Sequence, residues 1–244
     1  MQKDCDCYVS SGLLPPKPYF TFMAVGSSSS GKSRALQTFI SNFECFYPNY
    51  LVRKLIILAP IWQETSYGPL FEKFGREKCN YYNDLTEQMI ENREEIFGEA
   101  NANSVCIVYC DDMASHLSKN ISLEHLATTL VTHQKLLFCI SAQSLHQSQS
   151  SIWRTVLKNV HIMGISNSPR ERLSAQILFE QIFGSNGRKI ARAVIKEVTK
   201  EQKERYNNGY YFIYLSLHAD VDDRQRIFYD FMSNQPIIYV PVCL

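Results

Sequence analysis

The chain has 244 residues, 45% of them hydrophobic, and its 25 basic and 24 acidic residues leave a formal net charge of +1. This length and composition exclude a disordered polypeptide and predict a compact soluble fold with a sizeable core. The near-neutral total gives no sign of nucleic-acid binding, so any polyanion would have to meet a local basic patch.

No apolar run approaches the roughly 18 residues needed to span a membrane. The N-terminus is polar and unlike a signal peptide, so we expect an intracellular protein. The eight cysteines form no Cys-x-x-Cys pair, and Cys106 and Cys139 sit in apolar runs. This pattern favours reduced, buried thiols over a metal site, with Cys5 and Cys7 as a weak exception.

Residues 1–18 are rich in proline and small residues, and they predict an N-terminal tail before one domain at 19–244. Apolar runs predict strands at Tyr19–Val25, Lys54–Ala59, Val105–Tyr109, Leu136–Ser141 and Val160–Ile165. Helical patterns occupy Gly31–Phe46, Leu85–Phe97, Leu123–Val131 and Pro169–Phe183. The alternation predicts an α/β fold with a mostly parallel sheet covered on both faces. Further strand-like runs near the C-terminus are expected to extend the sheet edge or to form a small β-appendage.

The segment GSSSSGKS at 26–33 matches the phosphate-binding pattern G-x-x-x-x-G-K-[ST]. It lies between a predicted strand and a predicted helix, so its backbone N–H groups and the helix N-terminus would face a phosphate. A flexible serine linker is the alternative, but a linker is not expected beside a buried strand. Lys32 is expected to bridge the β- and γ-phosphates, and Ser33 to bind Mg²⁺. The predicted nucleotide-binding residues are Gly26, Ser27, Ser28, Ser29, Ser30, Gly31, Lys32, Ser33 and Arg34.

Asp111 and Asp112 follow the predicted strand VCIVYC. Carboxyl ends of strands face the ligand in such sheets, so we expect Asp111 to hold Mg²⁺ and Asp112 to activate the attacking water. A helix N-cap or a turn would explain an isolated Asp-Asp pair, but the phosphate loop favours the catalytic interpretation. Gln143 follows the next strand and is expected to contact the γ-phosphate or the water; a surface glutamine is the alternative.

The stretch from Gly187 to Arg205 carries seven basic and three acidic residues and is the best candidate for a polyanion patch. The alternative is a solvated helix face whose Ile190, Val194 and Val198 face the core.

The order of these motifs resembles that of viral genome-packaging ATPases of the poxvirus type. These belong to the FtsK/HerA class and are also encoded by large DNA viruses, virophages and Polinton-like elements. The segments at 154–159 and 169–170 and the closing strand-like runs are similar to family segments, so the resemblance covers about residues 19 to 241. Two positions depart from the family pattern. Ser29 stands where glycine is usual, and Leu130 stands near an expected arginine, although His133 is retained.

The resemblance implies a RecA-like ASCE fold with strand order 5-1-4-3-2 and a homo-oligomeric ring, hexameric or pentameric, with ATP and Mg²⁺ between subunits. It implies ATP hydrolysis coupled to translocation of double-stranded DNA into a capsid, with capsid or portal components as partners. The expected location is the host cytoplasm or nucleus at virus assembly sites, or the virion. Arginines from a neighbouring subunit are expected to complete the site. The candidates are Arg154, Arg170 and Arg172, with purely structural arginines as the alternative.

Two other functions stay open. A P-loop nucleotide kinase is disfavoured by the second acid, Asp112, and by the lack of an arginine-rich lid. A nucleotide-dependent assembly subunit that does not hydrolyse ATP is disfavoured by the intact set of predicted site residues.

Overall fold

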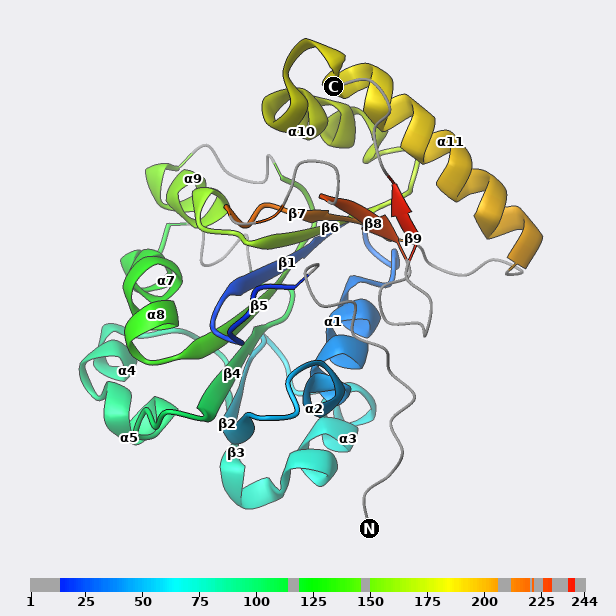
Figure 1. The fold of residues 1–244 in the computed structure, drawn as a ribbon. Helices are drawn as coiled ribbons and strands as arrows, with labels where there is room; N and C mark the ends of the chain where they lie inside the picture. Colours follow the sequence, from blue (N-terminus) through cyan, green and yellow to red (C-terminus); the bar gives the residue numbers. More distant parts are fainter. Residues whose placement is uncertain are drawn as a thin grey trace.

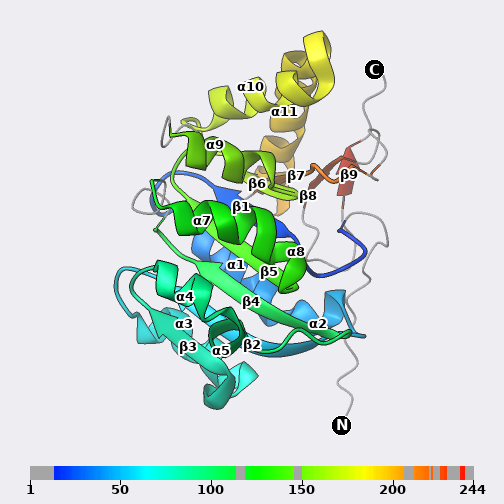
Figure 2. The ribbon, with the colours of Figure 1, turned by 90° about the vertical axis from the view of Figure 1, so that its left-hand side faces the viewer.

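The computed structural model describes residues 14–113, 119–145, 150–205, 212–219, 221, 226–229 and 237–239. Within these residues, one β-sheet runs through the molecule, with helices on both of its faces (Figures 1 and 2). Most of the predicted N-terminal tail, including Cys5 and Cys7, lies outside the described residues. In the described part of the chain, no helix has the length and apolar composition needed to cross a bilayer.

The sheet has nine strands in the order β3-β2-β4-β5-β1-β6-β7-β8-β9. The pairs from β3 to β6 are parallel, and those from β6 to β9 are antiparallel. The strands are β1 Thr21–Val25, β2 Leu51–Leu58, β3 Cys79–Tyr82, β4 Ser104–Cys110, β5 Leu136–Ala142, β6 Ile162–Ser166, β7 Phe212–Ser216, β8 Ile227–Tyr229 and β9 Ile237–Tyr239.

The predicted α/β fold and strand order are confirmed, because the five predicted strands correspond to β1, β2, β4, β5 and β6 and lie in the order 5-1-4-3-2. The C-terminal strands extend the edge of the sheet as antiparallel partners. Strand β3 was not predicted: it has four residues, three of them only half-buried, and lacks the apolar run that marks the central strands.

The helices are α1 Lys32–Ser41, α2 Phe43–Phe46, α3 Glu64–Phe74, α4 Glu87–Glu91, α5 Arg93–Phe97, α7 Ile121–His125, α8 Val131–His133, α9 Ser151–Lys158, α10 Arg172–Phe183 and α11 Gly187–Arg205. A π-helical turn, η2 Leu126–Leu130, joins α7 to α8. Two predicted helices are each divided in two, at Asn42 and at Asn92. Asparagine favours helix ends over helix interiors, which explains both breaks.

Helix α3 was not predicted, because Gly68 and Pro69 lie in its interior and such a pair usually marks a turn. The helix buries Tyr67, Leu70 and Phe74 against one face of the sheet. Burial of these large apolar side chains outweighs the poor local helix propensity.

Two hydrophobic clusters cover the two faces of the sheet. One joins it to α1, α2 and α3, and the other joins it to α4, α5 and the helices from α7 to α11. The end of the predicted tail belongs to the first cluster, since Leu14 is buried there and Tyr47 donates a hydrogen bond of 2.8 Å to the Pro15 carbonyl.

Four cysteines, Cys79, Cys106, Cys110 and Cys139, are free and buried. Burial raises the pKa of the Cys79 thiol to about 11 and that of Cys106 to about 12, so both stay protonated. The expectation of reduced thiols is therefore met at these four positions. It is wrong for Cys45, which is disulfide-bonded. Among the described residues, no group of three or more His, Cys, Asp or Glu side chains is placed to hold a metal ion.

Candidate active site

The predicted phosphate-binding loop joins the end of β1 to the start of α1. Its first residue, Gly26, donates a backbone hydrogen bond of 3.1 Å to the Ala142 carbonyl at the end of β5. A Cβ atom at Gly26 would come within 2.6 Å of the Ser166 Cβ, so glycine is required there. Gly31, with φ 86°, precedes α1 in the left-handed conformation that glycine adopts without strain. Close packing therefore explains the glycine at position 26, and a left-handed backbone explains the glycine at position 31.

Ser29 also has a left-handed backbone, with φ 61°. Such a conformation costs a non-glycine residue about 1–2 kcal/mol. We expect Ser29→Gly to be more stable than Ser28→Gly by about 1 kcal/mol, because both changes loosen the unfolded chain equally but only the first relieves strain. Urea unfolding of the two variants measures the difference. Equal stability would show that Ser29 is not strained.

Asp111 is buried at the end of β4 and accepts three hydrogen bonds from hydroxyl groups. Its Oδ1 accepts from Ser33 Oγ at 2.8 Å and from Ser141 Oγ at 2.8 Å, and its Oδ2 accepts from Tyr67 Oη at 2.9 Å. These donors hold the carboxylate beside the Ser33 hydroxyl. Hydroxyl and carboxylate oxygens are ligands that Mg²⁺ accepts, so Ser33 and Asp111 fit a shared magnesium site.

Asp112 has a different environment from Asp111. Its backbone is left-handed, with φ 54°, and its side chain is exposed. Its N–H donates to Ser141 Oγ at 2.8 Å, and its Oδ1 accepts from Gln143 Nε2 at 3.0 Å. Asp tolerates this backbone better than most residues, and outliers of this kind cluster at functional sites. The geometry leaves Asp112 open to water, whereas Asp111 is enclosed.

These groups line one cavity of about 300 Å³ at the carboxyl ends of β1, β4 and β5, where ligands bind in parallel sheets. Lys32 is mostly buried there, and its Nζ donates to the Ser27 carbonyl at 3.0 Å. Burial lowers the pKa of Lys32, and the charges of Asp112, Asp111 and Glu171 act against this. The cavity is lined by Ser28, Ser29, Lys32, Ser33, Pro60, Ile61, Gln63, Ser66, Tyr67, Asp111, Asp112, Ser141 and Gln143.

Sequence reasoning missed several of these residues. Tyr67 comes from α3, which no pattern predicted, and it lies 44 residues from its partner Asp111. Glu171 is buried beside α10 and acts electrostatically on Lys32, which no motif indicated. Ser141 offered a signal, since it is a serine inside the apolar run of β5, two residues before Gln143.

Tyr67 acts on the site through Asp111. Burial, together with the charge and hydrogen bond of Asp111, raises the pKa of Tyr67 above its ordinary value, so its hydroxyl stays protonated and donates. We expect Tyr67→Phe to lower activity or magnesium affinity roughly tenfold, as loss of such supporting hydrogen bonds does at metal sites. ATPase rates measured against Mg²⁺ concentration test this.

A matched control is Tyr81→Phe, which removes a hydroxyl that donates to the Ala59 carbonyl at 2.8 Å instead of to Asp111. The control is expected to leave the magnesium dependence unchanged. Equal effects of the two changes would contradict a role of Tyr67 at Asp111.

No protein-family model matches the chain, and no curated protein matches it. Solved structures do match its fold. The genome packaging NTPase B204 from Sulfolobus turreted icosahedral virus 2, in complex with ATP-gammaS, has a TM-score of 0.51 at 14% identity, covering 93% of this chain and 99% of that one. The fold is that of a P-loop NTPase.

Two further structures match this P-loop NTPase fold. B204 of the same virus in complex with AMP has a TM-score of 0.52 at 13% identity, covering 93% of this chain and 100% of that chain. B204 described as the DNA-packaging ATPase from Sulfolobus Turreted Icosahedral Virus has a TM-score of 0.50 at 13% identity, with the same coverage.

The predicted arginines do not line the cavity of their own chain. Arg34 on α1, Arg154 on α9, Arg170 before α10 and Arg172 at its start are all exposed, and none lines the cavity. Their roles in nucleotide binding stay predictions, as does the role of Gln143.

Proposed function

We propose that this chain hydrolyses ATP and uses the energy to move double-stranded DNA into a viral or virus-like capsid. The observation that carries the proposal is the meeting of Lys32 and Ser33 with Asp111 and Asp112 in one cavity. Support for a packaging role comes from the fold similarity to the genome packaging NTPase B204. We also propose that several copies of the chain form a ring, as in poxvirus-type ATPases of the FtsK/HerA class.

In the proposed reaction, water attacks the γ-phosphorus of ATP, the bond to the β–γ bridging oxygen breaks, and ADP and phosphate leave. Asp112 accepts the proton of the attacking water, and Gln143 orients Asp112 through their 3.0 Å hydrogen bond. Lys32 stabilises the charge on the β- and γ-phosphates. Ser33 and Asp111 would hold Mg²⁺, which supplies positive charge to the phosphates when bound.

An arginine from a neighbouring subunit is proposed to complete the site. In this chain the exposed Arg154 and Arg170 lie outside the cavity that holds Lys32 and Asp112, so a neighbouring subunit would have to supply them. An arginine delivered in this way stabilises the charge that develops during phosphoryl transfer.

The test is the rate of phosphate release by the purified chain with and without duplex DNA, measured together with its molecular mass in solution. We expect Mg²⁺-dependent hydrolysis that rises with DNA and a mass several times that of one chain. Absence of nucleotide binding, or transfer of phosphate to a nucleoside monophosphate in place of water, would refute the proposal.

A further inference from the structure

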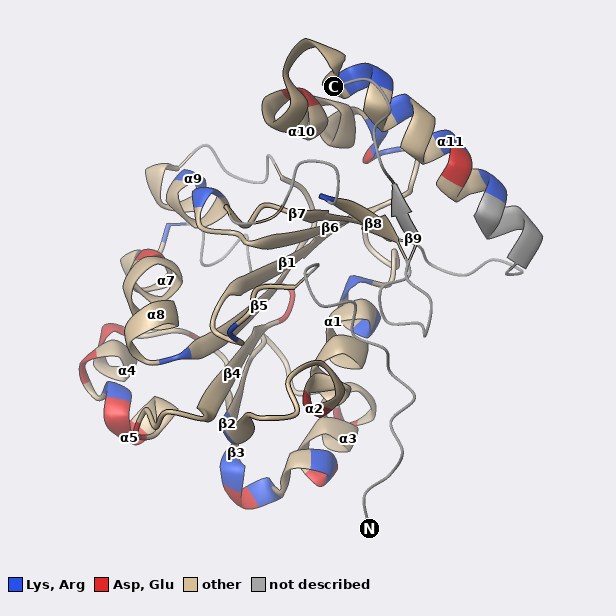
Figure 3. Cartoon of the chain, in the orientation of Figure 1, with Lys and Arg blue, Asp and Glu red and all other residues tan. Residues whose placement is uncertain are grey.

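Helices α10 and α11 form a pair at the end of the molecule that carries β6 to β9 (Figure 1). One side of α11 belongs to the core, where Val194 and Val198 are buried. The other side is exposed and carries several basic residues (Figure 3). The alternative predicted for the 187–205 stretch, a solvated helix face with apolar residues toward the core, is therefore confirmed, whereas its role as a polyanion patch stays a prediction.

A cleft of about 580 Å³ lies between α10 and α11. Ile195 forms part of its wall, and its other lining residues are Arg172, Gln176, Arg192, Lys196, Thr199 and Lys200. Four of these described lining residues carry positive charge, and none of them is a carboxylate. A concave site whose charges are all positive attracts anions more strongly than the same charges spread over a convex surface.

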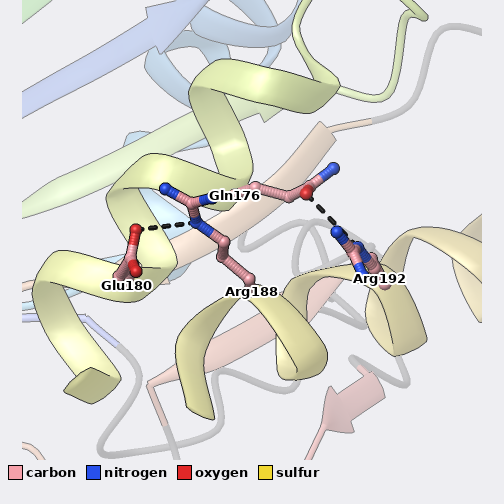
Figure 4. A network of polar contacts seen from close by, with 4 residues as sticks. All are labelled: Gln176, Glu180, Arg188 and Arg192. Carbon is pink, nitrogen blue, oxygen red and sulfur yellow. Dashed lines mark hydrogen bonds and ion pairs between the residues drawn. The ribbon is translucent and has the colours of Figure 1, made fainter. Parts of the chain in front are cut away.

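The four cations have no ion-pair partner among the residues whose side chains the structure describes. Arg192 instead donates to the neutral Gln176 amide at 3.4 Å. One turn earlier on α11, Arg188 does pair with Glu180, at 2.7 Å (Figure 4). Glu180, the one acid labelled in Figure 4, therefore pairs with Arg188, which does not line the cleft.

The spacing of the charges favours a polymeric anion over a single phosphate. Arg192, Lys196 and Lys200 follow one another at intervals of four residues, so they form a row along α11 with a rise of about 6 Å per step. Arg172 faces this row from α10. A linear chain of phosphates can contact all of these groups, whereas one phosphate group cannot.

The cleft is also connected to the nucleotide cavity through short segments of chain. Thr199 Oγ1 accepts a hydrogen bond of 3.0 Å from Asn167 Nδ2, and the preceding residue, Ser166, lies against Gly26 of the phosphate loop. Arg172 directly follows Glu171, whose charge acts on Lys32. An anion in the cleft would therefore contact the same segment that borders the phosphate loop.

We propose that the α10–α11 cleft binds the phosphate backbone of duplex DNA. The choice of DNA among polyanions rests on the proposed function, while the site itself rests on the charges and shape of the cleft. Contacts to phosphates alone would give binding without sequence preference, as a translocase requires.

The experiment measures binding of a fluorescently labelled duplex to the full chain, without nucleotide, over a range of salt concentrations. The test variant is Arg192→Gln/Lys196→Gln. The matched control is Arg188→Gln/Lys189→Gln, which removes the same net charge from the exposed side of the same helix but outside the cleft lining. Thermal unfolding verifies that both variants fold.

We expect the test variant to bind roughly tenfold more weakly, and its dependence of log K on log salt to be shallower by about two units, one for each phosphate that the variant no longer neutralises. The control is expected to bind nearly as the unaltered chain. Equal losses in both variants, or no DNA binding by the unaltered chain, would overturn the proposal. Binding to phosphatidylserine vesicles is measured in parallel. A test variant that loses vesicle binding but keeps DNA binding would also overturn the proposal.

A separate measurement of ATP hydrolysis distinguishes this proposal from the proposed function. An unaltered chain that hydrolyses no ATP but binds DNA through the cleft refutes the function and supports the cleft. A chain that hydrolyses ATP but binds DNA equally well in both variants supports the function and refutes the cleft.

Discussion

Asp112→Asn is expected to slow ATP hydrolysis strongly while leaving nucleotide binding intact. Asparagine has the same shape and tolerates the left-handed backbone at this position, where φ is 54°. It cannot accept the proton of the attacking water, and loss of a general base lowers the rate by roughly 10²–10⁴-fold. Because Asp112 is exposed and its backbone N–H contact to Ser141 does not depend on the carboxylate, the fold is expected to be unchanged.

The measurement pairs steady-state phosphate release with equilibrium binding of a fluorescent ATP analogue. The control is Glu72→Gln, which neutralises an exposed acid on α3 outside the cavity. If Asp112→Asn retains a rate close to that of the control, Asp112 is not the general base.

Lys32→Ala is expected to impair both binding and hydrolysis. Lys32 lines the cavity and is only 8% exposed, and it is the one basic residue among the described residues of the lining. Without it, the triphosphate would face Asp111 and Asp112 with no opposing side-chain charge among the described lining residues. We expect a loss of at least roughly 100-fold in kcat, as for removal of a single preorganised charge-stabilising donor, together with weaker ATP binding.

The matched control for this change is Lys78→Ala, which removes an exposed lysine that does not line the cavity. Both variants are compared by phosphate release and by circular dichroism. A folded Lys32→Ala protein with the activity of the Lys78→Ala protein would exclude the cavity as the site of hydrolysis.

The parts of the fold that sequence predicts well are those where local pattern and tertiary role agree. The run before Gly26 is apolar because β1 is buried on both faces, and the loop that follows has a fixed pattern, so strand, loop and helix were predicted together. The strand order was predicted from the family resemblance and not from local pattern, and the observed sheet confirms it.

The parts that were missed depend on contacts between distant segments. Helix α3 contains Gly68 and Pro69, so its local signal is that of a turn, and only packing on the sheet makes it helical. Without α3, Tyr67 could not be placed beside Asp111. In the same way, the charge of the 187–205 stretch was visible in the sequence, but the pairing of Arg188 with Glu180 and the cleft beside Arg192 required the position of α10.

The most direct test of a nucleotide-hydrolysing cavity is an experimental structure of the chain with Mg²⁺ and a non-hydrolysable ATP analogue. The predicted result is a triphosphate enclosed by the loop 26–33, with its γ-phosphate facing Lys32 and Asp112 and with a metal ion about 2.1 Å from the Ser33 hydroxyl oxygen. A nucleotide bound elsewhere, or a triphosphate with Asp111 and Asp112 turned away from it, would contradict the proposed site and the reaction assigned to it.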